Sequence, residues 1–171
     1  MALTTAQLQA LKAAIVADNA LNSQPMNDDG AFAIQDALKA TASPDFYIWK
    51  APGEVTRGEI LGNGYDWPRV DNLTVGKARI WDQMMLVIDL GQLAMAQANV
   101  RAGVNAAFDG SADANMRASI FGHHQRLANR GERIFSTGTG TSTTNTGTGP
   151  GTTTVYGVIS IADIKAARAL Q

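Results

Sequence analysis

The chain has 171 residues, of which 45% are hydrophobic and 17% are charged; this composition suits one globular domain with a hydrophobic core. It contains no cysteine, which excludes disulfides and thiolate metal sites. The formal net charge of −1 argues against sequence-independent binding of nucleic acid, because such binders carry clustered excess Lys and Arg. No stretch approaches the roughly 18 consecutive apolar residues of a membrane span. The N-terminus also lacks the basic leader of a signal peptide, so we expect a soluble protein.

Two helices are predicted in the first quarter of the chain. Thr4 and Gln7 have the spacing of a capping box, and the apolar residues that follow repeat at three and four, so we expect a helix over residues 5–18. A second helix is expected over residues 30–41. It ends before Pro44, because the residue before a proline is disfavoured in the α region.

The middle of the chain alternates between irregular and helical patterns. Residues 45–50 are aromatic and β-branched, which predicts a short extended run; we favour packing on a helical core over a base-stacking role. Residues 52–73 are rich in turn formers. Thr74 is expected to cap a helix over residues 75–88, whose apolar side chains cover half of its circumference, and another helix is expected over residues 96–108.

One long stretch, residues 113–135, is predicted to form a single amphipathic helix of about six turns. Its apolar side chains share one arc, and Gly131 within that arc allows another helix to approach closely. Arg126, Arg130 and Arg133 gather on the opposite side. This stripe is either a solvated helix face or a charged surface that meets another subunit, and the sequence alone leaves both interpretations open.

The last part of the chain changes character. Residues 136–154, the Gly/Thr tract, hold ten Thr, five Gly and no charge; we expect the tract to be mobile in an isolated chain unless its backbone pairs with a neighbour. Residues 155–159 are predicted to form a short strand. Ser160 is expected to cap a last helix over residues 161–170.

Together these patterns predict a mainly α protein with three parts. Residues 1–135 form a helical bundle of about five helices, and residues 136–154 form an extended Gly/Thr-rich arm. Residues 155–171 form a short β element and a C-terminal helix that pack back on the bundle.

The sequence contains no convincing catalytic or metal-binding pattern. His123 and His124 are adjacent, so on a helix they point about 100° apart and cannot both ligate one ion easily. The glycine-rich residues 62–64 and 138–140 do not lie between a buried strand and a helix, and no Gly-x-Ser-x-Gly elbow occurs. We therefore predict no enzymatic activity, no catalytic residue, no cofactor and no metal.

Four segments resemble a family of small proteins encoded among the head and tail morphogenesis genes of tailed bacteriophages. The run LANRGERIFSTGTGT is the most specific of them. The four segments are residues 1–22, 29–49, 73–81 and 127–141. Residues 143–151 depart from the family pattern, in which the tract before the final strand is shorter. The likeness otherwise spans nearly the whole chain, and its motifs are structural rather than chemical.

The resemblance implies a structural virion protein of the neck. In such phages a head-to-tail connector, or adaptor, is a mostly helical subunit that forms a ring of about twelve copies under the portal and joins the capsid vertex to the tail. The implied partners are other copies of the chain, the portal protein and a tail or nozzle protein, with no membrane and with passive contact to DNA in the channel. The implied location is the virion neck, after assembly in the host cytoplasm. A tail-completion protein, a capsid decoration protein and a phage DNA-associated protein remain as alternatives.

We expect the intersubunit or portal interface to combine the arginine stripe with the Gly/Thr tract. The hypothesis is that residues 136–156 supply a strand that pairs with another subunit. The predicted interface residues are Arg126, Arg130, Arg133, Thr137, Gly138, Thr139, Gly140, Thr141, Val155 and Tyr156.

Overall fold

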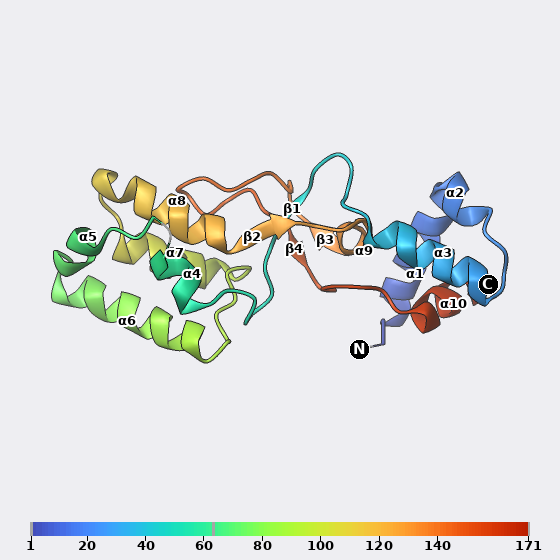
Figure 1. The fold of residues 1–171 in the computed structure, drawn as a ribbon, viewed down its shortest axis with the longest axis horizontal. Helices are drawn as coiled ribbons and strands as arrows, with labels where there is room; N and C mark the ends of the chain where they lie inside the picture. The colour runs from blue at the N-terminus through green and yellow to red at the C-terminus, as the bar shows by residue number, and fades with distance from the viewer. Residues whose placement is uncertain (1, 63, 171) are drawn as a thin grey trace. The chain divides into compact units, whose positions relative to one another are not determined.

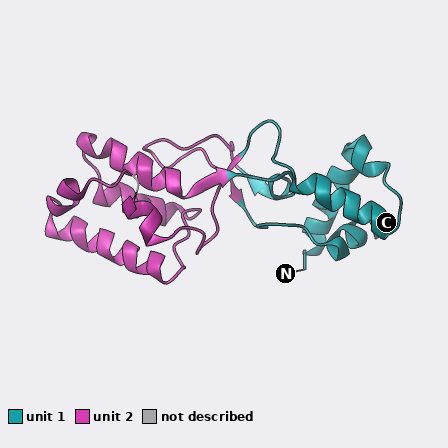
Figure 2. Cartoon of the chain, viewed as in Figure 1, with its two compact units in different colours: residues 1–46, 127–137, 153–171 teal, residues 47–126, 138–152 magenta. Residues whose placement is uncertain are grey.

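The computed structural model describes residues 2–62 and 64–170 and divides the chain into two compact units (Figure 2). Unit 1 contains residues 1–46, 127–137 and 153–171, and unit 2 contains residues 47–126 and 138–152. Of the three predicted ranges, 1–135 and 136–154 are therefore each divided between the units, and 155–171 belongs to unit 1. Helices dominate both units (Figure 1), so the prediction of a mainly α protein is confirmed.

Unit 1 packs three longer helices around an aliphatic core. Its helices are α1 (Thr5–Ala17), α2 (Asn19–Asn22), α3 (Asp28–Lys39), α9 (Arg130–Ile134) and α10 (Ile161–Ala169). The predicted capping box begins α1, since Thr4 Oγ1 accepts from the backbone N–H of Gln7 at 3.3 Å and Gln7 Oε1 accepts from that of Thr4 at 2.9 Å. Ser160 caps α10 as predicted, by accepting from the backbone N–H of Asp163. The buried core is Leu11, Ile15, Leu21, Ala31, Ile34, Leu38, Phe135, Ile159, Ile164 and Ala167.

Unit 2 packs its helices around large aromatic and sulfur-containing side chains. Its helices are α4 (Arg57–Gly62), α5 (Trp67–Asp71), α6 (Val75–Asp89), α7 (Ala98–Ala107), the 3₁₀ turn η1 (Ser111–Asp113) and α8 (Ala114–His123). The buried core is Trp49, Val55, Ile60, Trp81, Met84, Met85, Ile88, Leu93, Met95, Val104, Ala107, Phe108, Met116, Ile120 and Phe121. The indole N–H of Trp81 donates to the Tyr65 hydroxyl at 2.7 Å, which satisfies the polar atom of that buried ring.

Four short strands form two pairs. Strand β1 (Tyr47–Trp49) pairs with β2 (Gln125–Leu127), and β3 (Ser136–Thr137) pairs with β4 (Thr152–Thr153). The extended run expected over residues 45–50 is thus confirmed as β1. The strand expected over residues 155–159 is wrong: the last described strand ends at Thr153, and Gly157 adopts a φ of 82° that interrupts an extended backbone.

The single helix expected over residues 113–135 is also wrong. Helix α8 ends at His123, β2 follows, and α9 begins only at Arg130. The cause is a second capping box, in which Asn129 Oδ1 accepts from the backbone N–H of Glu132 at 2.7 Å and Glu132 Oε2 accepts from that of Asn129 at 3.0 Å. This box starts a new helix and leaves residues 125–127 free to pair with β1.

Candidate functional site

The most specific segment of the resemblance forms a polar hub in unit 1. Glu132 is completely buried, and its Oε1 accepts from the backbone N–H of Gly157 at 2.7 Å while its Oε2 closes the capping box of α9. Asn129 adds a hydrogen bond from its Nδ2 to the carbonyl of Gly157 at 3.2 Å. Gly131 leaves room for Ile159, whose Cδ1 would lie 2.9 Å from a Cβ at that position. The close approach predicted for Gly131 therefore exists, but its partner is a loop residue and not a helix.

This hub explains how unit 1 is assembled from distant segments. Residue 132 belongs to the middle segment of unit 1 and residues 157–159 belong to its last segment. The backbone N–H of Arg130 also donates to the carbonyl of Ala40 in the first segment, at 2.8 Å. One short helix and its cap thus make hydrogen bonds to both other segments of unit 1, so the motif helps to hold these segments together.

The three arginines do not lie on one helix face, so the predicted stripe is wrong as a geometric feature. Arg126 belongs to β2 in unit 2, and its Nε lies 3.5 Å from the Oε2 of Glu54. In unit 1, Arg130 pairs with Asp18 at 2.5 Å, and this hydrogen bond is the largest cause that lowers the pKa of the Asp18 carboxyl. Each arginine thus has a partner in its own chain.

Arg133 and Arg130 nevertheless share one hollow of unit 1. The Nη1 of Arg133 donates to the carbonyls of Ser43 at 3.0 Å and Pro44 at 3.2 Å, and its guanidinium carbon lies 5.6 Å from the centre of the Phe46 ring. The hollow has a volume of about 290 Å³ and is lined by Ala42, Ser43, Arg130, Arg133 and Ile134. A role of these arginines at an interface remains a prediction.

The Gly/Thr tract is held by its own chain, which differs from the expected mobile arm. In unit 2 the backbone N–H of Tyr47 donates to the carbonyl of Gly140 at 2.7 Å, and the backbone N–H of Gly151 donates to the carbonyl of Tyr47 at 2.8 Å. The guanidinium of Arg117 donates from Nε to the carbonyl of Asn145 at 3.0 Å. Backbone pairing does order this side-chain-poor segment, as the composition requires, but the pairing strand is β1 of the same chain.

The side chain of Gln125 clamps the far part of the tract. Its Oε1 accepts from the backbone N–H of Thr143 at 2.8 Å, and its Nε2 donates to the hydroxyl of Ser142 at 3.0 Å. Gly147 then lies against the ring of Phe121, where a Cβ would come within 2.6 Å of Cζ. The segment that departs from the family pattern is therefore packed on α8 and β2 of unit 2.

The predicted interface residues of the tract fall into both units. Thr137 lies in β3 of unit 1, whereas residues 138–141 lie in unit 2. The hydroxyl of Thr139 donates to the carbonyl of Gly149 at 2.9 Å, and the backbone N–H of Thr141 donates to the same carbonyl at 3.1 Å. Since several backbone groups of residues 138–151 are bonded within the chain, a continuous intersubunit strand over residues 136–156 would require these bonds to break.

Val155 and Tyr156 lie in unit 1 beside the N-terminal segment. Both are partly buried, and they line a hollow of about 290 Å³ together with Leu3, Gln7 and Asp163. The walls of this hollow are partly apolar and partly polar, and the side chains that line it do not form a catalytic arrangement. It is a candidate contact surface only.

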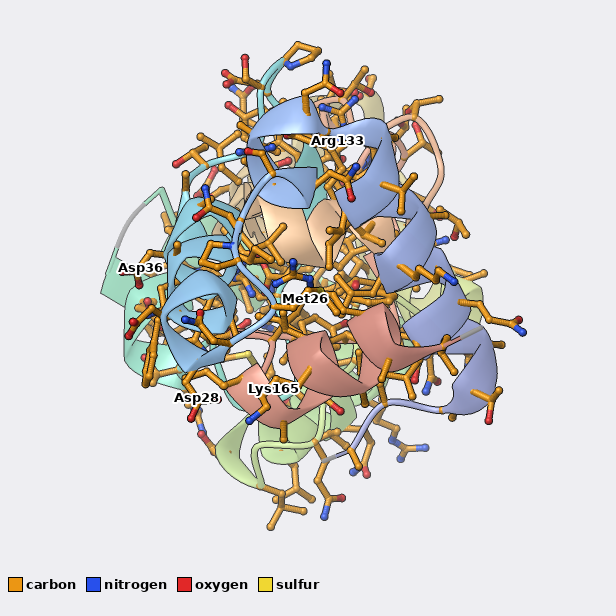
Figure 3. All side chains as sticks on the ribbon, turned by 90° about the vertical axis from the view of Figure 1, so that its right-hand side faces the viewer. Met26, Asp28, Asp36, Arg133 and Lys165 are labelled. Carbon is orange, nitrogen blue, oxygen red and sulfur yellow. The ribbon has the colours of Figure 1, made fainter. Side chains whose placement is uncertain are left out.

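Sequence reasoning missed the exposed apolar side chains. Phe32, an apolar residue of the second predicted helix (α3), is 53% exposed. Periodicity identifies the apolar face of a helix but does not tell whether anything covers it. Figure 3 shows Met26 between α3 and α10, near the Asp28–Lys165 ion pair. Among the described residues, the exposed large apolar side chains are Val16, Met26, Phe32, Leu127 and Val158 in unit 1 and Trp67, Val75, Ile80, Leu86 and Leu90 in unit 2.

His124 is buried in unit 2. Its Nδ1 lies 2.7 Å from the carbonyl of Ile120, so this nitrogen is the one that carries the proton in the neutral ring. Its buried Nε2 has no hydrogen-bond partner in the part of the chain that the structure describes, and burial lowers the pKa of the ring below its ordinary value. Within residues 2–62 and 64–170, no group of three or more His, Asp or Glu side chains could hold a metal ion.

None of the helices in the described residues is long and apolar enough to cross a membrane. Comparison with known proteins adds no relative: no protein-family model, no curated protein and no solved structure matches this chain.

Proposed function

We propose that the protein is a structural virion protein: a head-to-tail adaptor that forms a ring under the portal and joins the capsid vertex to the tail of a bacteriophage. The observation that carries the proposal is the likeness of residues 127–141 to the phage family. Residues 129–132 of this run make the hub of unit 1. A motif that acts by holding chain segments together suits a protein whose work is assembly.

The distribution of exposed apolar side chains supports a role as a ring subunit. A ring is closed by heterologous contacts, so each subunit needs two different adhesive surfaces. Phe32 and Met26 supply apolar surface in unit 1, and Trp67 supplies it in unit 2. Each subunit of a ring is held by two neighbours and by the portal at once, so individually weak contacts suffice.

Within unit 1, the hollow lined by Arg130 and Arg133 is our candidate for the portal contact. Guanidinium groups retain free donors after one hydrogen bond and bind carboxylates in a defined geometry. The hollow beside Val155 and Tyr156 is a second contact surface in the same unit. No catalytic step belongs to this proposal.

The proposal is tested by mixing the purified protein with the portal protein encoded in the same genome. We expect negative-stain images and particle mass to show a ring of adaptor subunits bound coaxially to each portal. The variant Phe32→Glu should weaken this assembly about tenfold, because it charges an exposed apolar contact. The substitution Gln9→Glu on α1, also exposed, is the matched control and should leave assembly unchanged.

Two outcomes would overturn the adaptor assignment. One is the absence of any complex with intact portal rings at high protein concentration. The other is association with isolated tails but not with the portal, which would identify a tail-completion protein.

A further inference from the structure

Helix α6 of unit 2 has an unusual exposed face. Its inward side chains at positions 81, 84, 85 and 88 are buried in the core. On the outward side, Val75 is 70% exposed, Leu86 is 51% exposed and Leu90, the residue that ends the helix, is 61% exposed. Apolar side chains on both faces of one helix indicate that the outer face has a partner of its own.

The exposed residues form one stripe with charges at its centre. Val75, Arg79, Asp82 and Leu86 are separated by four, three and four residues, so they lie along one side of the helix, and Leu90 continues the row. The stripe therefore has an apolar position at each end and one positive and one negative side chain between them.

These two central charges differ from the other charges of the helix. Lys77 pairs with Asp109, and Asp89 pairs with Arg57. Both central residues, in contrast, are exposed, and no ion pair to either is found among the described residues. The stripe thus retains a positive and a negative group that are available to another chain.

We propose that this stripe is a contact with the α6 stripe of a second copy of the chain, in antiparallel orientation. A two-fold axis between positions 79 and 82 places Arg79 opposite the second copy's Asp82, and the same operation places Val75 opposite Leu86. The stripe is self-complementary in this register, with two ion pairs at the centre and an apolar pair on each side. A parallel arrangement would instead oppose Arg79 to Arg79.

The size of the contact sets its strength. A helix of 15 residues is about 22 Å long, and one pair of such helices buries less than the roughly 800 Å² per partner of a standard interface. The pairing is therefore weak and reversible when α6 acts alone. The pairing goes beyond the proposed ring. A cyclic ring is closed by contacts between two different faces of the subunit, whereas a two-fold contact uses the same face on both copies.

Charge reversal tests the partner. In sedimentation velocity of the full chain over a concentration series, we expect a monomer–dimer equilibrium. Arg79→Glu and Asp82→Arg should each weaken the dimer by about tenfold or more, because two like-charge pairs replace two ion pairs. An equimolar mixture of the two variants should regain the affinity of the original protein, since every opposed pair is then of opposite sign. Gln9→Glu, at an exposed position of α1 in unit 1, is the control and should leave this equilibrium unchanged.

Cross-linking tests the register. The chain has no cysteine, so single cysteines can be introduced without background. A mixture of Val75→Cys and Leu86→Cys should form an intermolecular disulfide on oxidation. The variant Val75→Cys alone should not, because its two copies would lie about 16 Å apart along the paired helices, beyond the roughly 7 Å limit between the Cα atoms of a disulfide.

Three results would overturn the pairing: a monomer at every concentration, a dimer that responds to neither charge reversal, or equally fast cross-linking of Val75→Cys alone. Charge reversals that alter only portal binding would also overturn it, because they would assign the stripe to the portal. The portal-binding test of the proposed function gives its answer independently, since it requires no α6 pair.

Discussion

The two units are both mainly helical, but different interactions hold them together. Unit 1 joins three separate chain segments, and its core is aliphatic except for Phe135. The hydrogen bond from the backbone N–H of Gly157 to the buried carboxylate of Glu132 ties its last two segments together. Unit 2 is built mostly from the continuous residues 47–126, and its core contains edge-on contacts between large rings, such as Trp81 and Phe108 at 5.0 Å.

Unit 1, which is made of dispersed segments, thus depends on a few hydrogen bonds to one buried carboxylate, whereas the nearly continuous unit 2 depends on the packing of large side chains. The positions of the tryptophans allow the unfolding of the two units to be measured separately. Its three tryptophans, Trp49, Trp67 and Trp81, all belong to unit 2. Tryptophan fluorescence therefore reports the unfolding of unit 2, while far-ultraviolet circular dichroism reports both units.

The largest effect is expected for Glu132→Ala. It removes a fully buried side chain and the acceptor of the backbone N–H groups of Asn129 and Gly157, and the lost hydrogen bonds together with the space left behind should lower the free energy of unfolding of unit 1 by on the order of 3 kcal/mol. In urea, the circular dichroism transition should then split, with one part preceding the fluorescence transition. Glu59→Ala is the matched control in unit 2: Glu59 accepts from the backbone N–H of Thr56 in the same way but is exposed, so its loss should cost about 1 kcal/mol or less.

An unsplit transition, or a loss for Glu132→Ala no greater than that for Glu59→Ala, would show that the polar hub does not hold unit 1.

A smaller effect, in the other unit, is expected for Gly147→Ala. Gly147 has a φ of 70°, and its added Cβ would meet the Phe121 ring at 2.6 Å, so both backbone strain and overpacking oppose the change. We expect unit 2 to lose about 2 to 3 kcal/mol, measured by tryptophan fluorescence in urea. Gly157→Ala separates the two causes, because Gly157 has a φ of 82° with nothing within 4 Å of the added Cβ. The Gly157→Ala substitution should lower the free energy of unfolding of unit 1 by only about 1 kcal/mol.

Equal losses for the two glycine variants would mean that the tract is not packed tightly against Phe121 in solution.

The smallest effect is the response of unit 2 to acid through His124. Burial lowers the pKa of His124 in the folded protein below the value of 6.5 for the unperturbed ring, and a proton on Nε2 would add a buried donor without an acceptor. The unfolded chain therefore binds this proton at a higher pH than the folded chain does. Its contribution to stability is complete above about pH 6.5 and is lost as the pH falls through the folded pKa.

We expect the urea midpoint of the fluorescence transition to fall between pH 7 and pH 5, and to fall less in His124→Gln, whose side chain does not titrate. The nearby charged groups Lys50, His123 and Glu59 are retained in the variant, so they act equally on both proteins. An identical pH dependence in the two proteins would contradict the assignment.

Local signals in the chain predicted most helix starts. The Thr4 and Ser160 caps were readable because a cap joins residues two or three positions apart. The break at Asn129 carried the same kind of signal, a capping box with Glu132, but the apolar periodicity continues across it and favoured one long helix. Pairing of β1 with β2 could not be read locally, because these strands are more than seventy residues apart.

The same distinction between local sequence signals and tertiary structure applies to the candidate surfaces. The proposed function depends on residues 127–141, whose pattern is contained in the sequence alone, and it stays a proposal. The separation of Arg126 from Arg130 and Arg133, and the exposure of Leu86 and Leu90 on α6, came only from the structure.

The sequence by itself determined that the protein is mainly helical, where most of its longer helices begin, and that residues 136–154 have too few large apolar side chains to build a core of their own. Only the tertiary structure decided what orders most of that tract, namely β1, Arg117 and Gln125 of unit 2. The physical reason is that helix caps and periodicity are interactions between near neighbours in the chain. The order of a segment without large side chains depends instead on backbone partners far away in sequence, which no local pattern encodes.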